Sequence, residues 1–226
     1  SGTASGSIAL AVGSNTITTV VTAQNGTTTS TYTITVTRSL PSTVSTLSGL
    51  VLNSGTLSPT FAAVTTAYTA SVSNATASVT VTPTVTDATA TVKVNGTTVA
   101  SGTASGSIAL AVGSNTITTV VTAQDGTTKK TYTITVTRIS NVSTLSGLVL
   151  NSGTLSPTFA AGTTAYAASV SNATTAITLK PTVTDTTATV KVNGTTVASG
   201  AASGSIALTV GINTISTVVT AQNGTT

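Results

Sequence analysis

The sequence predicts an all-β protein built from tandem seven-stranded antiparallel β-sandwiches strung in series. Three observations predict this fold class: apolar residues recur at every second position, turn signals separate the short runs, and a long segment repeats. About a quarter of the 226 residues are Thr, a β-branched residue that favours extended backbone. Only 4% are charged, whereas long surface helices need charged residues on their solvent face.

The internal repeat defines the organisation of the chain. Residues 1–25 recur from Ser101 with one change, Asn25 to Asp125, and recur again from Ser199 with small changes. Residues 46–61 recur identically at 144–159. The first offset, from 1 to 101, exceeds the second, from 46 to 144, by two residues. This length difference falls in one short segment, which identifies that segment as a linker.

These offsets divide the chain into five parts. Residues 1–38 are the C-terminal part of a repeat, and residues 39–46 are a linker. Residues 47–138 form a complete repeat, and residues 139–144 form a second linker. Residues 145–226 form a nearly complete repeat that lacks its last strand. We therefore expect the chain to be a segment of a longer repeating polymer that continues in both directions.

The apolar residues within residues 47–138 have a period of two, which predicts about seven short strands. Asn95-Gly96 lies between two such runs and is a strong hairpin signal. Pro83 falls late in a strand, which indicates an edge strand or a bulge there. The residues expected to face the core are Leu50, Leu52, Tyr68, Ala70, Val72, Val79, Val81, Pro83, Val85, Ala90, Val92, Val94, Ile108, Leu110, Val112, Ile117, Thr119, Val121, Ala123, Tyr132, Ile134 and Val136.

Four segments of the repeat, in this order, carry a resemblance to a known family. They are LSGLVLNSGTLSPTF, TTAYTASV, VTVTPTVTDATATVKVNGTTV and GSNTITTVVTAQDGTTKKTYTITVTR. Together they resemble the bacterial cadherin-like β-sandwich domain. The resemblance implies an immunoglobulin-like sandwich that occurs in tandem on large bacterial secreted and surface proteins. It supplies no catalytic residues to carry over.

The residue inventory argues against catalysis and against metal or cofactor binding. The chain has no His, Cys or Glu, so general acid–base catalysis and nucleophilic triads lack their usual groups. Calcium takes six to eight oxygen ligands, several of them carboxylates. The only acidic residues are Asp87, Asp125 and Asp185, and the sequence favours ordinary turn roles for them. We expect no catalytic, cofactor-binding or metal site, and no cofactor.

Covalent cross-links and N-linked sugar are weaker hypotheses. An isopeptide bond between Lys93 and Asn115 is conceivable, but the alternation places Lys93 on the solvent face. Ester bonds at Gln24, Gln124 and Gln222 are conceivable too, but each Gln precedes a hairpin turn that its side chain is expected to hydrogen-bond. The Asn-x-Ser/Thr triplets at Asn74 and Asn95 read as glycosylation acceptors, although a Thr-rich chain produces such triplets by chance.

Charge and hydropathy exclude two further classes of partner. The net charge is +4, from seven basic and three acidic residues, and the only adjacent basic pair is Lys129-Lys130 at a turn. Nucleic-acid binding needs clustered basic residues, so we expect none. No apolar run reaches the length of a membrane span, so we expect no span in this sequence.

Rows of Thr are the most unusual feature of the expected surface. Thr80, Thr82, Thr84 and Thr86 share one face of a strand, and so do Thr131, Thr133, Thr135 and Thr137. Such rows resemble ice-binding faces locally, but a twisted sandwich sheet is seldom flat, and high β-propensity without charge accounts for them more simply.

The sequence therefore favours a structural or adhesive role. We expect a repeat segment of a bacterial extracellular fibre or large cell-surface protein, with self-association through lateral or homotypic contacts as its main partner interaction. Two alternatives remain open: a passive spacer that presents other domains, and a module that binds cell-surface polysaccharide. Sugar sites usually present exposed aromatic rings, whereas Tyr32, Tyr68, Tyr132 and Tyr166 are all expected to alternate inward.

Overall fold

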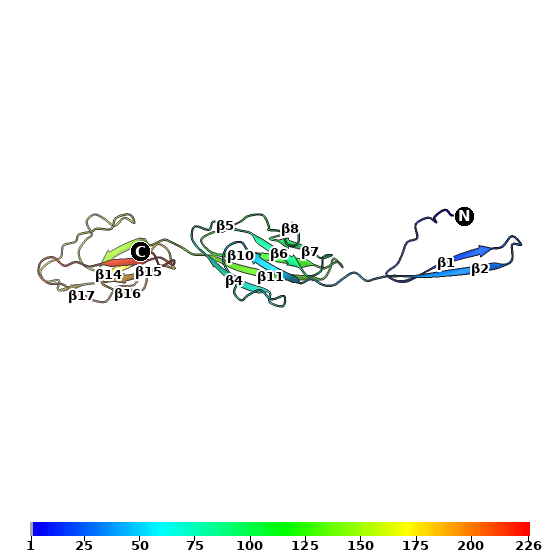
Figure 1. Ribbon diagram of the computed structural model, residues 1–226. Coiled ribbons are helices and arrows are strands. Elements are labelled where there is room, and N and C mark those ends of the chain that lie inside the picture. The colour runs from blue at the N-terminus through cyan, green and yellow to red at the C-terminus, as the bar shows by residue number, and fades with distance from the viewer. Residues whose placement is uncertain (1) are drawn as a thin grey trace.

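A computed structural model of the chain describes residues 2–226 and shows three consecutive β units arranged along one line (Figure 1). The described residues contain strands, turns and loops and no helix. The strands of the first two units are β1 (Gly13–Thr22), β2 (Thr29–Arg38), β3 (Leu47–Leu52), β4 (Ala67–Val72), β5 (Ser78–Val79), β6 (Val81–Val85), β7 (Thr91–Val94), β8 (Thr97–Val99), β9 (Ile108–Ala109), β10 (Gly113–Thr122) and β11 (Lys129–Arg138). The third unit contains β12 (Leu145–Leu150), β13 (Ala176–Ile177), β14 (Leu179–Val183), β15 (Thr189–Val192), β16 (Thr195–Val197), β17 (Ile206–Ala207) and β18 (Thr217–Thr220).

The middle unit is a two-layer sandwich. One layer is a five-stranded sheet in the order β4-β11-β10-β7-β8, and the other is made by the pairs β3-β6 and β5-β9. The pairs are antiparallel except β4 and β11, which run parallel from the pairing of Thr133 with Ala67 to that of Arg138 with Val72. The all-β sandwich is therefore as predicted, but an entirely antiparallel arrangement is not. A connection of more than fifty residues separates these two strands, long enough for a parallel crossover.

The core lies between the two layers, where the predicted alternation holds through most strands. Tyr132, Ile134 and Val136 are fully buried on the inner face of β11, while the intervening Thr residues remain partly exposed. Thr119, on the inner face of β10, is equally buried, and its hydroxyl has no hydrogen-bond partner within residues 2–226. The core is therefore aliphatic and tyrosine-rich, as the lack of Trp and Met requires.

Two local expectations meet different outcomes. Pro83 lies in β6 opposite Leu50, and the register of the partner strand shifts between Leu47 and Gly49, as expected of a proline near an irregularity. Val112 was expected inside but is 49% exposed. The strand β9 ends at Ala109 and the chain bends at Val112, just before β10 begins at Gly113 with a φ of 92°, so the alternation does not extend to Val112.

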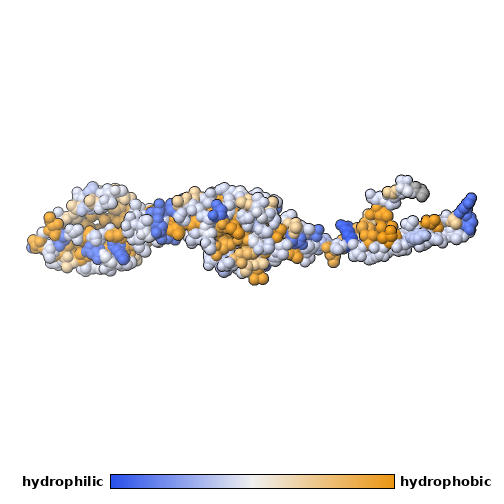
Figure 2. All heavy atoms as spheres, viewed as in Figure 1, coloured by the Kyte–Doolittle hydropathy of each residue, from blue (hydrophilic) through white to orange (hydrophobic). Residues whose placement is uncertain are grey.

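The first unit is a long hairpin of β1 and β2 with the same register as β10 and β11. Its inner face is uncovered, and Figure 2 shows hydrophobic residues on its surface. Tyr32 is 62% exposed and Ile34 is 59% exposed, whereas their counterparts Tyr132 and Ile134 are buried completely. The expectation that Tyr32 lies inside is thus wrong for this chain, because β1 and β2 form a two-stranded sheet with no second layer among the described residues to cover it.

The third unit repeats the middle one with fewer strands. Ala165–Val170 corresponds to β4 but forms no strand, and only the second half of the segment corresponding to β10 pairs, as β18. Their counterparts in the middle unit, β4 and β10, both pair with β11, and the sequence given contains no counterpart of β11 in the third unit. Tyr166 is consequently only half-buried, and Ile212 is 98% exposed.

Candidate functional site

A linker serine is held at the entry end of the middle unit by two backbone hydrogen bonds. The backbone N–H of Ser42 donates to Oε1 of Gln124 at 2.9 Å, and its carbonyl accepts from the N–H of Asp125 at 3.2 Å. The Ser42 hydroxyl is the main cause that lowers the pKa of Asp87, ahead of the N–H and hydroxyl of Thr89. Two turns that are distant in sequence thus grip the segment that enters the unit.

The third unit repeats this arrangement with equivalent residues. The N–H of Ser140 donates to Oε1 of Gln222 at 3.0 Å, and its carbonyl accepts from the N–H of Asn223 at 3.1 Å. The Ser140 hydroxyl is likewise the main cause that lowers the pKa of the Asp185 carboxyl. Ser140 is only 1% exposed, so this linker residue is part of the folded unit. We call each set, Ser42-Asp87-Gln124 and Ser140-Asp185-Gln222, a linker clamp.

Sequence reasoning missed the linker clamps. Gln124 and Gln222 were expected to hydrogen-bond their own hairpin turns, but each side-chain carbonyl accepts from the linker instead. The residue after each Gln closes the hairpin turn instead. In the middle unit this residue is Asp125, whose carboxylate accepts from the N–H groups of Thr127 and Thr128. A signal was present, because Ser42, Asp87 and Gln124 all recur at one offset as Ser140, Asp185 and Gln222. Gln24 precedes the corresponding turn of the first hairpin.

The acidic residues occupy turns. Oδ1 of Asp87 accepts from the backbone N–H of Thr89 at 2.9 Å and from its hydroxyl at 2.7 Å, and Asp185 does the same with Thr187. Among residues 2–226, no three potential metal-ligating His, Cys, Asp or Glu side chains lie together. Each carboxylate is therefore engaged locally, with neighbours that offer few further charged oxygens.

Calcium removal should leave the melting temperature unchanged. The reason is that a ligand stabilises a fold only in proportion to its binding, and single carboxylates bind calcium weakly. Scanning calorimetry of the chain with excess calcium and with excess chelator measures this. A fall of several degrees on chelation would contradict the expectation.

Asp125 closes the hairpin turn between β10 and β11. Its carboxylate accepts from the Thr128 hydroxyl and from the backbone N–H groups of Thr128 and Thr127, which lower its pKa from 3.8 to about 2. The first and third units carry Asn25 and Asn223 at the same place, and both amides accept from the same turn. The turn thus needs the side-chain oxygen and not the charge.

Asp125→Asn should weaken the acid sensitivity of the middle unit. A carboxyl whose pKa is lower in the folded state stabilises the fold at pH values above its unfolded pKa, and this contribution disappears as pH falls through the folded pKa. The contribution of Asp125 should thus be lost between about pH 4 and pH 2, and the variant should lose less stability over that range. Urea unfolding at pH 6 and pH 2.5 tests this, and equal losses in both proteins would contradict it.

The proposed covalent partners are not brought together. Lys93 is exposed and lies opposite Val120, five residues along β10 from Asn115 and therefore on the other face of the sheet. The Asn115 amide donates to the carbonyls of Ala111, Gly113 and Val136. The Asn74 amide nitrogen, where N-linked sugar would attach, donates to the carbonyl of Ile139 at 3.0 Å. The two asparagine side chains have structural partners already.

The row Thr131–Thr137 lies on the outer face of the five-stranded sheet, whereas the row Thr80–Thr86 lies on the outer face of the other layer, along β6. Thr135 pairs with Thr116 on one side and Thr69 on the other, so hydroxyls line up across three strands. The neighbouring row pairs Thr137 with Ser114 and Ser71. This face is rich in hydroxyls and also carries the exposed Lys93 and Lys129, and its hydroxyls suit contacts with other hydroxylated surfaces through many weak hydrogen bonds.

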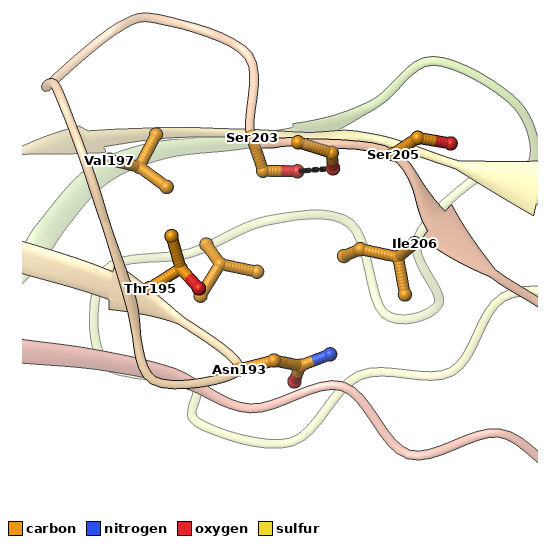
Figure 3. A pocket seen from close by; sticks show the side chains of 8 residues that line it. Asn193, Thr195, Val197, Ser203, Ser205 and Ile206 are labelled. Carbon is orange, nitrogen blue, oxygen red and sulfur yellow. Dashed lines mark hydrogen bonds between the residues drawn. The ribbon is translucent and has the colours of Figure 1, made fainter.

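One hollow, of about 230 Å³, lies in the third unit beside the Asn193-Gly194 turn (Figure 3). Val197 and Ile206 line it with Ser203, whose hydroxyl donates to the carbonyl of Gly204 and accepts from the N–H of Leu179. None of its lining side chains is ionisable. The hollow therefore offers no group for acid–base or nucleophilic chemistry.

Comparison with known proteins agrees with this architecture. The sequence model of the family described as "Cadherin-like beta sandwich domain" matches residues 1–39, 46–139 and 145–226. A search of curated proteins found no match. Within residues 2–226 there is no helix long and apolar enough to cross a bilayer.

Proposed function

Because the chain belongs to the cadherin-like β-sandwich family, we propose that it is a structural and adhesive repeat segment of a bacterial extracellular fibre or large surface protein. Domains of this family are structural or adhesion-type modules, usually extracellular and typically without enzyme activity. Such a segment acts by reach, spacing and repeated contact surfaces.

The observation that carries this proposal is the end-to-end order of the units. The middle sandwich receives its linker at one end, at Ser42, and releases the chain at the other, at Ile139, so the units follow one another in a line (Figure 1). The linker clamps fix where each unit begins. Repetition of such units lengthens the molecule without adding a new kind of surface, as a fibre or stalk requires.

Self-association follows from the nature of the surface. The edge strands β4 and β8 of the five-stranded sheet contain no charged residue, although charge is a common protection of sheet edges. The outer face between them presents the row Thr131–Thr137. Uncharged edges and hydroxyl-rich faces of identical units favour homotypic or lateral contacts, in which one copy meets another.

Two alternatives predict different behaviour. A passive spacer would stay monomeric at all concentrations. A polysaccharide-binding module would present aromatic rings, but Tyr68 is 2% exposed and Tyr132 is fully buried. Their hydroxyls hydrogen-bond backbone groups of the loop before β4, at Ala62 and Ala63. The buried rings favour the fibre over the sugar-binding module.

Concentration-dependent assembly tests the proposal. Sedimentation velocity and negative-stain images of the purified chain over a wide concentration range should show larger species, in the end filaments, while a glycan array should show no specific binding. A chain that stays monomeric throughout would support the spacer. Specific glycan binding without assembly would support the polysaccharide module.

A further inference from the structure

The joint between the second and third units is a single peptide bond. On one side of it, Ile139 belongs to the middle unit: its N–H donates to the carbonyl of Val72 at 3.0 Å, and its carbonyl accepts from the Asn74 amide at 3.0 Å. On the other side, Ser140 is clamped into the third unit. No residue is left between the two tied residues to act as a flexible spacer.

The exit side of the joint is reinforced by Arg138. Its guanidinium donates from Nε to the carbonyl of Asn74 at 2.8 Å and from Nη1 to the carbonyl of Leu110 at 2.9 Å. The residue is half-buried at the end of β11. The last strand, the loop after β4 and the first linker residue are thereby tied to one another.

The preceding joint is two residues longer. Ser39 follows Arg38 as Ile139 follows Arg138, and Ser42 is clamped as Ser140 is. Leu40 and Pro41 therefore stand between the two positions, and Leu40 is 79% exposed. A short linker with free residues allows the units it connects to reorient, whereas one without them does not.

We infer that the residues between the exit arginine and the linker clamp set the stiffness of each joint, so that the joint at 139–140 is rigid and the joint at 39–42 is a hinge. This inference rests on the proposed function, because stiffness matters only in a chain of units in series. A polymer with both kinds of joint consists of rigid pairs connected by flexible points. The persistence length of such a polymer then depends on the lengths of its linkers and does not require bound calcium.

Spin-label distance measurements on the full chain test the rigid joint. The sequence has no Cys, so Thr98→Cys and Thr196→Cys, at exposed equivalent positions in the second and third units, give one label each. The unaltered joint should give a narrow distance distribution. Insertion of Leu-Pro between Ile139 and Ser140, which copies the preceding joint, should broaden it about twofold, because two backbone units become free.

The matched control inserts the same Leu-Pro after Gly162, in an exposed loop of the third unit, and should leave the width unchanged. Asn74→Ala and Gln222→Ala remove one tie on each side of the joint and should each broaden the distribution. The inference is wrong if the distance distribution of the labelled chain without insertion is already as broad as that of the linker-insertion variant, or if the linker insertion leaves the width unchanged. Neither result would bear on self-association, which decides the proposed function separately.

Discussion

Tyr132→Ala should destabilise the middle unit by about 3–5 kcal/mol, as aromatic truncations in protein cores do. The ring is fully buried, and its hydroxyl donates to the carbonyl of Ala63 at 2.9 Å and accepts from the N–H of Leu47 at 3.1 Å. The side chain therefore ties β11 to β3 and to the loop before β4. Urea unfolding of the full chain, followed by hydrogen exchange in residues 47–138, measures the loss.

Two neighbouring variants make this result specific. Tyr132→Phe keeps the ring and removes the hydroxyl, so it should cost only about 1–2 kcal/mol. Thr133→Ala, on the outer face, should cost less than about 1 kcal/mol. Equal losses for Tyr132→Ala and Thr133→Ala would mean that the inner and outer faces of β11 are exchanged.

Adding a last strand should stabilise the third unit on the order of 5 kcal/mol, because the strand buries several apolar side chains and covers others. The addition is a copy of Lys129–Arg138 placed after Thr226, in the register that β11 has with β10. The segment 165–170 should then pair as β4 does, and Tyr166 should become buried. Hydrogen exchange resolved along residues 145–226 measures the gained protection.

The control for this addition has the same length and charge without the apolar pattern. In it, the positions copied from Tyr132, Ile134 and Val136 carry Thr. This tail should give little protection, because it offers nothing to bury. Equal protection from both tails would show that the third unit does not need the apolar side chains that β11 buries in the middle unit.

The sequence was sufficient to predict the sandwich because the period of two persists across most strands. Tyr132 and Thr133 illustrate this, since each lies on the face that alternation assigns to it. The parallel pairing of β4 with β11 could not be predicted, because alternation specifies faces but not neighbours or direction. The exposure of Tyr32 was missed for a different reason: burial depends on strands that this sequence does not contain.

The linker clamps show where pattern reasoning ended. A Gln before a turn suggests a local hydrogen bond, but Gln124 bonds Ser42, which is 82 residues away. Contacts of this kind depend on which loops meet at the end of the folded sandwich. The secondary-structure propensities of the residues carry no information on which loops meet there. The repeat did contain a signal, because Ser42, Asp87 and Gln124 recur with the same identity in the third unit although the linkers before the two units differ in length.

Small-angle X-ray scattering tests the central claim, that the units lie in series as an extended rod. A compact protein of 226 residues would have a radius of gyration of about 17 Å. The account predicts a value at least about one and a half times larger, with β-rich circular dichroism that excludes an unfolded chain. A radius near that of a compact domain, with the same β content, would mean that the units fold back on one another, and it would contradict a function based on reach and spacing.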